Sequence, residues 1–184
     1  MELEIIYQDQ DFVAINKPSG LLVHRSPIDK HETEFAIQIL KQQLGRPVFP
    51  VHRLDKPTSG VLLFALNKIA LTDAQKLFQA SSLGESNSLF KSYHAVVRGH
   101  SPETAHIDHP VKAQIDKRHP DKRNHLQGIT DLTTLAQTQI PVHIETYDVS
   151  RYSLVKLSPS TGRRHQLRYH MKHISHPIIG DAKY

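Results

Sequence analysis

The sequence predicts an α+β fold in which a mixed, mainly antiparallel sheet is flanked by a few helices. Three observations predict it. Strand-like segments outnumber helical ones over the 184 residues. The two kinds do not alternate regularly, as they would in a parallel α/β fold. No Pro-, Gly- or Ser-rich linker divides the chain, so one domain over residues 1–184 is expected.

The N-terminal half contains short apolar segments that are typical of strands, and two segments with helical spacing. LEIIY (3–7), FVAIN (12–16), LLVH (21–24) and VLLFAL (61–66) predict strands. Thr33 is a suitable N-cap for the first helix, which Gly45-Arg46-Pro47 ends. The expected inner faces of the two helices are Ala36, Ile39, Leu40 and Leu44, and then Ala70, Ala74, Leu77 and Phe78.

The C-terminal half predicts three further strands and one basic helix. FKSYHAVVR (90–98) alternates, with Tyr93, Ala95 and Val97 on one face. Residues 100–128 are polar, rich in His and Pro, and predict a loop that contains the basic stretch KRHPDKRNH (117–125). DLTTLAQTQ (131–139) and YSLVKLSP (152–159) follow as strands. The helix is expected to begin near residue 161 and to end at residue 175, before a His-Pro pair.

Composition narrows the class of protein. The formal net charge of +5 favours a polyanionic partner, and nucleic acid fits better than a membrane surface. Cysteine is absent, which excludes disulfides, Cys-ligated zinc and a thiol nucleophile, and fits a cytoplasmic location. No apolar run is long enough to cross a bilayer, and MELEIIYQDQ lacks the basic start of a signal peptide. No segment indicates an obligate protein partner.

Asp55 is the first candidate for chemistry. It lies in VHRLDKPTSG (51–60), among basic residues and directly before a turn. A carboxylate at the end of an extended segment can point into a cleft and act as a nucleophile or a base. The alternative is an ordinary Asp that caps the turn. A carboxylate that faces a polyanion repels it and so weakens binding. An Asp among basic residues of a polyanion-binding protein is therefore expected to have a function that outweighs this cost.

The segment TGRRHQLRYHMKHISHP (161–177) is the second candidate. Arg164, Arg168 and Lys172 share one face of a helix. Three interpretations of this face are possible. It binds phosphates, or one Arg turns inward and pairs with a buried carboxylate, or the charges are simply solvated. Three of its histidines, 170, 173 and 176, raise the question of a metal site, but steps of three drift around a helix and no fourth ligand is close in sequence.

Tyr93 is the third candidate, and several other chemistries find no support. A Tyr in an alternating strand is usually part of the core, whereas a functional Tyr provides a ring on which a nucleobase stacks.

The chain has no P-loop, no GxGxxG and no Gly-x-Ser-x-Gly. A glycosidase needs two carboxylates, and only one acid stands out.

Five motifs in order resemble those of the RluA-type pseudouridine synthases. HRLDKPTSG resembles the family's HRLD-x-x-TSG signature, and TGRRHQLRYH resembles its TGR-x-HQ-(L/I)-R-x-H helix. The other three are INKPSGLLVH (15–24), KSYHAVVRG (91–99) and HPIIGDAKY (176–184). VHRSPIDKHE (23–32), the IDK at 115–117 and HISHPIIGD further resemble the subgroup that modifies uridine 65 of tRNA. Members that modify rRNA share the five main motifs and are the alternative.

The resemblance implies the pseudouridine synthase fold and an isomerisation of uridine in RNA without cofactor or metal. It implies Asp55 as the catalytic aspartate, Tyr93 as the active-site tyrosine and Arg168 as the arginine partner that keeps Asp55 ionised. The target uridine is expected to flip out of its stack. Candidates for RNA contacts, for each of which a solvated surface charge is the alternative, are Arg53, Lys17, Arg25, Arg163, Arg164, Lys117 and Arg118.

Two departures from the family pattern concern the ends of the chain. The chain begins directly with the catalytic domain, whereas many members carry an N-terminal RNA-binding module. It stops at Tyr184, so C-terminal strands of the family fold are expected to be missing. The competing hypotheses are a non-catalytic RNA-binding domain with the same scaffold, and a glycosylase that releases the base.

Overall fold

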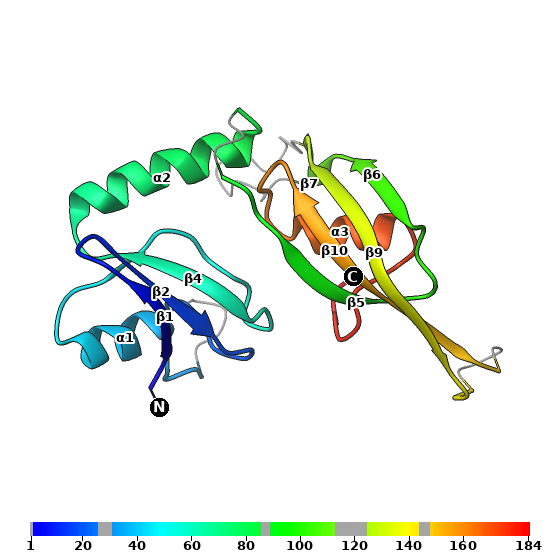
Figure 1. Cartoon of the computed structure of the whole chain (residues 1–184), viewed down its shortest axis with the longest axis horizontal. Helices are drawn as coiled ribbons and strands as arrows, with labels where there is room; N and C mark the ends of the chain where they lie inside the picture. Colours follow the sequence, from blue (N-terminus) through cyan, green and yellow to red (C-terminus); the bar gives the residue numbers. More distant parts are fainter. Residues whose placement is uncertain (1, 26–30, 86–88, 113–124, 144–147) are drawn as a thin grey trace. The chain divides into compact units, whose positions relative to one another are not determined.

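The computed structural model describes residues 2–25, 31–85, 89–112, 125–143 and 148–184 (Figure 1). The chain forms two compact units, Met1–Gln79 and Ala80–Tyr184. Every pairing between two described strands is antiparallel, and three helices accompany the strands within these residues. The predicted α+β class is therefore confirmed. The expectation of a single domain over residues 1–184 stays a prediction.

The first unit is built on a four-stranded sheet with a helix on either side (Figure 1). Its strand order is β1-β2-β4-β3, with β1 Glu4–Gln8, β2 Phe12–Lys17, β4 Gly60–Ala65 and β3 Phe49–Pro50. One face buries Val13, Ile15, Leu62 and Phe64 completely. Helix α1 (Ala36–Leu44) buries Ala36 and Leu40, and α2 (Lys68–Leu83) packs Ala70 and Ala74 with Ala65 of the opposite face. Alternation along β2 and β4 thus supplies both sides of the core.

Three details of the first unit differ from the prediction. Residues 21–24 form no strand, only an isolated bridge from Leu22 to Phe35. Phe35 is the N-cap residue of α1 and makes no side-chain capping bond, so the helix begins after Phe35 rather than at Thr33. Leu77 is 52% exposed and does not belong to the inner face of α2. The predicted end of α1 is correct, because Gly45 adopts the left-handed conformation of a helix C-terminus, with φ of 64°.

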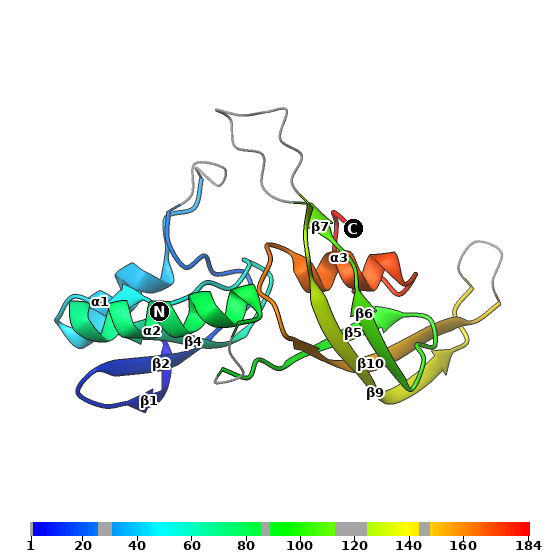
Figure 2. The ribbon, with the colours of Figure 1, turned by 90° about the horizontal axis from the view of Figure 1, so that it is seen from above.

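The second unit has a four-stranded sheet with α3 along one face (Figure 2). The strand order is β5-β10-β9-β6, with β5 Tyr93–Arg98, β10 Ser150–Pro159, β9 Ile129–Ile140 and β6 Thr104–Asp108. Helix α3 (Gln166–His173) packs Met171 into a cluster with Val97, Leu132 and Val155. Tyr93 and Ala95 pack against the same cluster, so the predicted inner face of this strand is confirmed.

The segment that the sequence predicts as a long loop contains further strands. Besides β6, it holds β7 (Val111–Lys112) and β8 (His125–Leu126), which pair with each other. Most of the basic stretch 117–125 lies outside the described residues. The basic helix begins at Gln166, later than predicted, because His165 before it has a left-handed backbone with φ of 56°.

Candidate active site

Asp55 lies in a turn that a second turn of the first unit holds in place. The side chain is half-buried, between β3 and β4. The backbone N–H of Gly20 donates to the Lys56 carbonyl at 2.8 Å, and the Ser19 hydroxyl donates to the Pro57 carbonyl at 2.7 Å. These bonds join the NKPSG turn to the LDKP turn. The loop that carries the candidate carboxylate is thus fixed at the two residues directly after Asp55.

Lys17 forms the floor of this turn. Its side chain has no exposed surface, and its ammonium donates to the carbonyls of Pro18, Leu21 and Lys56 at 2.9, 2.8 and 3.3 Å. Burial lowers the pKa of Lys17, and the negative charge of Asp55 acts in the opposite direction. Lys17 was predicted to contact a phosphate. A completely buried ammonium cannot do so at the surface, and the structure gives it the role of cross-linking the two turns.

His52 anchors the start of the same segment, a role that the sequence analysis missed. Its ring stacks on Phe78 with centroids 4.8 Å apart, and the N–H of Leu63 donates to Nε2 at 3.1 Å. Burial lowers the pKa of His52 to about 4, although a hydrogen bond with the Arg53 backbone raises it. The imidazole is therefore neutral at physiological pH. The available signal was the position of this His, directly before the Arg-Leu-Asp.

Tyr93 and Arg168 belong to the second unit. Tyr93 begins β5, lies opposite Leu157 of β10 and is half-buried against the core of this unit. Arg168 projects from α3 and forms a two-pronged ion pair with Asp181: Nε donates to Oδ2 at 2.6 Å and Nη2 to Oδ1 at 2.7 Å. The predicted pairing of Arg168 with Asp55 joins the two units, and it stays a prediction.

Asp181 is the second site residue that sequence reasoning missed. The guanidinium of Arg168 holds the pKa of this carboxyl far below its usual range, aided by hydrogen bonds from the backbone N–H groups of Lys183 and Tyr184. The guanidinium carbon of Arg168 lies over the Tyr184 ring, 5.2 Å from the centroid of that ring. The signal in the sequence was the Gly-Asp near the end of HPIIGDAKY.

A buried network of polar side chains fixes the start of α3. The Gln166 side chain accepts from the Thr161 hydroxyl at 2.8 Å and from the Arg163 backbone N–H at 3.0 Å. It donates to the Ile129 carbonyl at 2.9 Å and to the Thr130 hydroxyl at 3.0 Å. One side chain thus ties the helix that carries Arg168 to β9 by two hydrogen bonds and to the residues before the helix by two more.

The basic residues predicted to contact RNA occupy different environments. Arg53, Arg25 and Arg164 are exposed, as a phosphate contact requires, and Arg25 lies over the Phe35 ring at 5.8 Å. Arg163 is half-buried and donates through Nε to the Gln127 carbonyl at 2.9 Å. Lys117 and Arg118 lie outside the described residues.

The histidines of the basic helix do not converge. His170 is completely buried between the Thr130 hydroxyl and the His109 carbonyl, both at 3.0 Å. His173 stacks on His109 with centroids 3.5 Å apart, and Nδ1 of His176 lies 2.8 Å from the Arg98 carbonyl. Within the described part of the chain, no group of three or more His, Cys, Asp or Glu could hold a metal ion. No helix there is long and apolar enough to cross a membrane.

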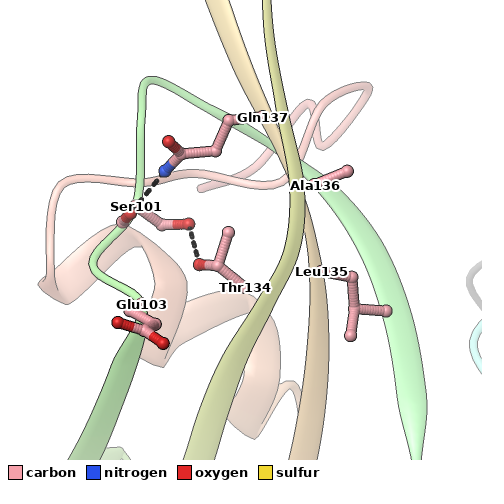
Figure 3. Close-up of a pocket in the computed structure, with 6 residues that line it drawn as sticks. All are labelled: Ser101, Glu103, Thr134, Leu135, Ala136 and Gln137. Carbon is pink, nitrogen blue, oxygen red and sulfur yellow. Dashed lines mark hydrogen bonds between the residues drawn. The ribbon is translucent and has the colours of Figure 1, made fainter.

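The second unit also has an open surface pocket of about 350 Å³, drawn in Figure 3. It lies where β9 has an irregularity in its pairing with β10, beside Leu135. Its polar groups bond one another: Ser101 and Thr134 share a hydrogen bond of 2.7 Å, and the Gln137 amide donates to the Ser101 carbonyl at 2.7 Å. None of the predicted site residues that the structure describes lines it, so the candidate site lies elsewhere.

Comparison with known proteins decides the family. The sequence profile of the RNA pseudouridylate synthases matches residues 11–173. The chain belongs to the RNA pseudouridylate synthase family. Members of this family isomerise uridine in RNA to pseudouridine, and the chain is accordingly an isomerase. The matched range includes Asp55, Tyr93 and Arg168 but ends before Asp181.

Individual relatives agree with this assignment. The chain is 47% identical to the tRNA pseudouridine synthase C of Pasteurella multocida, over all of this chain and 75% of that protein. It is 49% identical to the protein of the same name from Haemophilus ducreyi, over all of this chain and 74% of that protein. The solved structure of human RNA Pseudouridylate Synthase Domain Containing 1 is similar in fold, with a TM-score of 0.74 and 28% identity, over 98% of this chain and 68% of that one.

Proposed function

We propose that this pseudouridine synthase acts on tRNA and isomerises the uridine at position 65. The observation that carries the proposal is the identity of 47–49% along the whole chain with proteins named tRNA pseudouridine synthase C. The sequence of residues 23–32, which resembles the subgroup that modifies uridine 65, supports the same substrate. A tRNA substrate implies a cytoplasmic location. The exposed arginines and the net charge of +5 suit a polyanionic RNA.

In the proposed reaction, Asp55 is the reacting carboxylate. The N1–C1′ bond of the uridine breaks, the uracil turns, and C5 bonds to C1′. The C5 proton is lost and N1 is protonated, so the mass of the RNA is unchanged. Asp55 either attacks C1′ or takes a proton from C2′. The turn held by Lys17, Ser19 and Gly20 supports this role, because it holds the backbone next to the residue that carries the carboxylate.

Two residues of the second unit complete the proposed site. Tyr93 packs against the uracil ring and assists loss of the C5 proton after the turn. Arg168 pairs with Asp55 and keeps it ionised. Arg53, next to Asp55 and exposed, contacts the RNA backbone or fills the space that the flipped uridine leaves.

The decisive variant is Asp55→Asn, which keeps the shape of the side chain and removes its charge. We expect it to form no pseudouridine in an unmodified tRNA transcript, while its dissociation constant for that tRNA stays within about threefold of the wild type. The matched control is Asp73→Asn, which removes the same charge from an exposed ion pair with Lys76 on α2 and is expected to keep full turnover. Undiminished turnover by Asp55→Asn would contradict the role of this residue.

The substrate is tested by mapping pseudouridines in total RNA from cells with and without the gene. We expect loss of the signal at tRNA position 65. A lost rRNA signal would instead assign the chain to the rRNA-modifying members. Release of free uracil would indicate a glycosylase, and binding without any turnover would indicate an RNA-binding domain.

A further inference from the structure

The ion pair between Arg168 and Asp181 in the second unit is held at two points. Two donors of the guanidinium meet the two oxygens of one carboxylate, at 2.6 and 2.7 Å. The side chain of Asp181 is 4% exposed, and that of Arg168 is 21% exposed. A two-pronged pair in this geometry fixes the plane of the guanidinium as well as its position.

The carboxylate is itself held by the backbone. Oδ1 of Asp181 accepts from the N–H of Lys183 at 2.9 Å and from the N–H of Tyr184 at 3.2 Å. Its own N–H donates to the Ile178 carbonyl at 3.2 Å. Because the Tyr184 ring also lies under the guanidinium, the segment 178–184 holds Arg168 from two directions. The carboxylate therefore serves as a fixed support rather than a flexible counter-ion.

The pair joins Nε and Nη2 of Arg168 to the two carboxylate oxygens of Asp181. An Arg side chain has many rotamers, so holding it in one of them costs conformational entropy. A support on the Nε side fixes the direction in which the far end of the guanidinium projects. A reaction that uses Arg168 to orient a carboxylate gains from such a support, because misplacement of a positioning group by about 1 Å lowers rates roughly 100-fold.

We propose that Asp181 is a positioning residue for uridine isomerisation, and that its carboxylate fixes the guanidinium of Arg168 in the direction in which it acts on Asp55. The inference rests on the proposed function, because it takes Arg168 as the partner of Asp55. The competing explanation is purely structural: the pair ties the segment 178–184 to α3 and contributes only to stability.

Asp181→Asn separates the two explanations. The Asn Oδ1 can still accept from the N–H groups of Lys183 and Tyr184, but its NH₂ group meets a donor of Arg168. We expect kcat on unmodified tRNA to fall roughly 10- to 100-fold, with KM changed less than about threefold. The fraction of folded protein at the assay temperature is measured by circular dichroism. A loss of kcat that vanishes after correction for the unfolded fraction, or a wild-type kcat, overturns the positioning role.

A measurement without turnover follows the guanidinium directly. The Nε–Hε resonance of Arg168 in ¹⁵N NMR is assigned by its absence in Arg168→Lys. We expect slow proton exchange and restricted motion in the wild type, and fast averaging in Asp181→Asn. Asp73→Asn, with the same change of charge at an exposed pair, is expected to leave kcat, KM and this resonance unchanged.

The two readouts also distinguish the failure of each proposal. If the wild-type chain shows a restricted Arg168 resonance but forms no pseudouridine, the proposed function is contradicted. The positioning role is then contradicted as well, although the ion pair itself is confirmed. A wild-type chain that forms pseudouridine but whose Arg168 averages freely overturns the positioning role alone.

Discussion

The neutral imidazole of His52 makes the first unit sensitive to acid. Its pKa is lowered from 6.5 to about 4 by burial, and its Nε2 accepts a hydrogen bond that a protonated ring could not accept. Between pH 6.5 and 4 the unfolded chain binds more protons at this residue than the folded chain. Stability from this group is therefore complete above about pH 6.5 and is lost as the pH falls toward 4.

His52→Gln tests this effect. A Gln can offer an oxygen to the Leu63 N–H but does not titrate. Its free energy of unfolding in urea is expected to lie below that of the wild type at pH 7, and the difference should shrink by on the order of 3 kcal/mol by pH 4. A difference that stays constant over this range would contradict a buried neutral His52.

Among individual residues, the direction of a side chain was predictable where the chain alternates regularly. It was not predictable where tertiary contacts decide it. The inward direction of Tyr93 followed from the two-residue period of a strand. The burial of Lys17 did not, because its three carbonyl partners come from two separate turns. The pair of Arg168 and Asp181 crosses the end of a helix, so no helical period reveals it.

At the scale of the elements, the start of α3 is held by a single side chain. Gln166 is buried, and its amide makes four hydrogen bonds to the residues before the helix and to β9. We expect Gln166→Met, similar in size, to lower the free energy of unfolding by roughly 2–4 kcal/mol, because it leaves buried donors and acceptors unpaired. Urea denaturation followed by circular dichroism measures this loss.

The matched control is Gln137→Met on β9, the strand to which Gln166 donates. The Gln137 amide makes one hydrogen bond, to the Ser101 carbonyl, and the residue is exposed. Its replacement is expected to cost less than about 1 kcal/mol, because water can replace the lost bond. Equal losses for the two variants would mean that the buried network does not hold α3.

The elements were predicted where apolar residues repeat, and missed where they do not. The sequence predicts β5, β9 and β10 to within a few residues. It misses β6 because Thr, His and Asp occupy its outward positions, which resemble a polar loop. It predicts α3 too early because a left-handed His165 cannot be recognised from helical spacing.

At the scale of the whole molecule, charge and family agree on an RNA partner, but they differ in what they can specify. The family gives the reaction, and the net charge of +5 gives only attraction to phosphates. The described arginines 25, 53 and 164 are exposed, whereas Lys17 is withdrawn from the surface. Within the described residues, the RNA footprint is therefore expected to include these three exposed arginines and not Lys17.

This footprint predicts a strong salt dependence of binding. Four to six phosphate contacts, as an order-of-magnitude figure, lower the affinity for tRNA roughly 10²- to 10³-fold between about 50 and 200 mM salt. Arg164→Gln is expected to reduce the slope of log affinity against log salt by about 1. Lys41→Gln, which removes the same charge from an exposed position of α1, is expected to keep the wild-type slope. Because released counterions set the slope, a flat response in filter binding would exclude a footprint dominated by phosphate contacts.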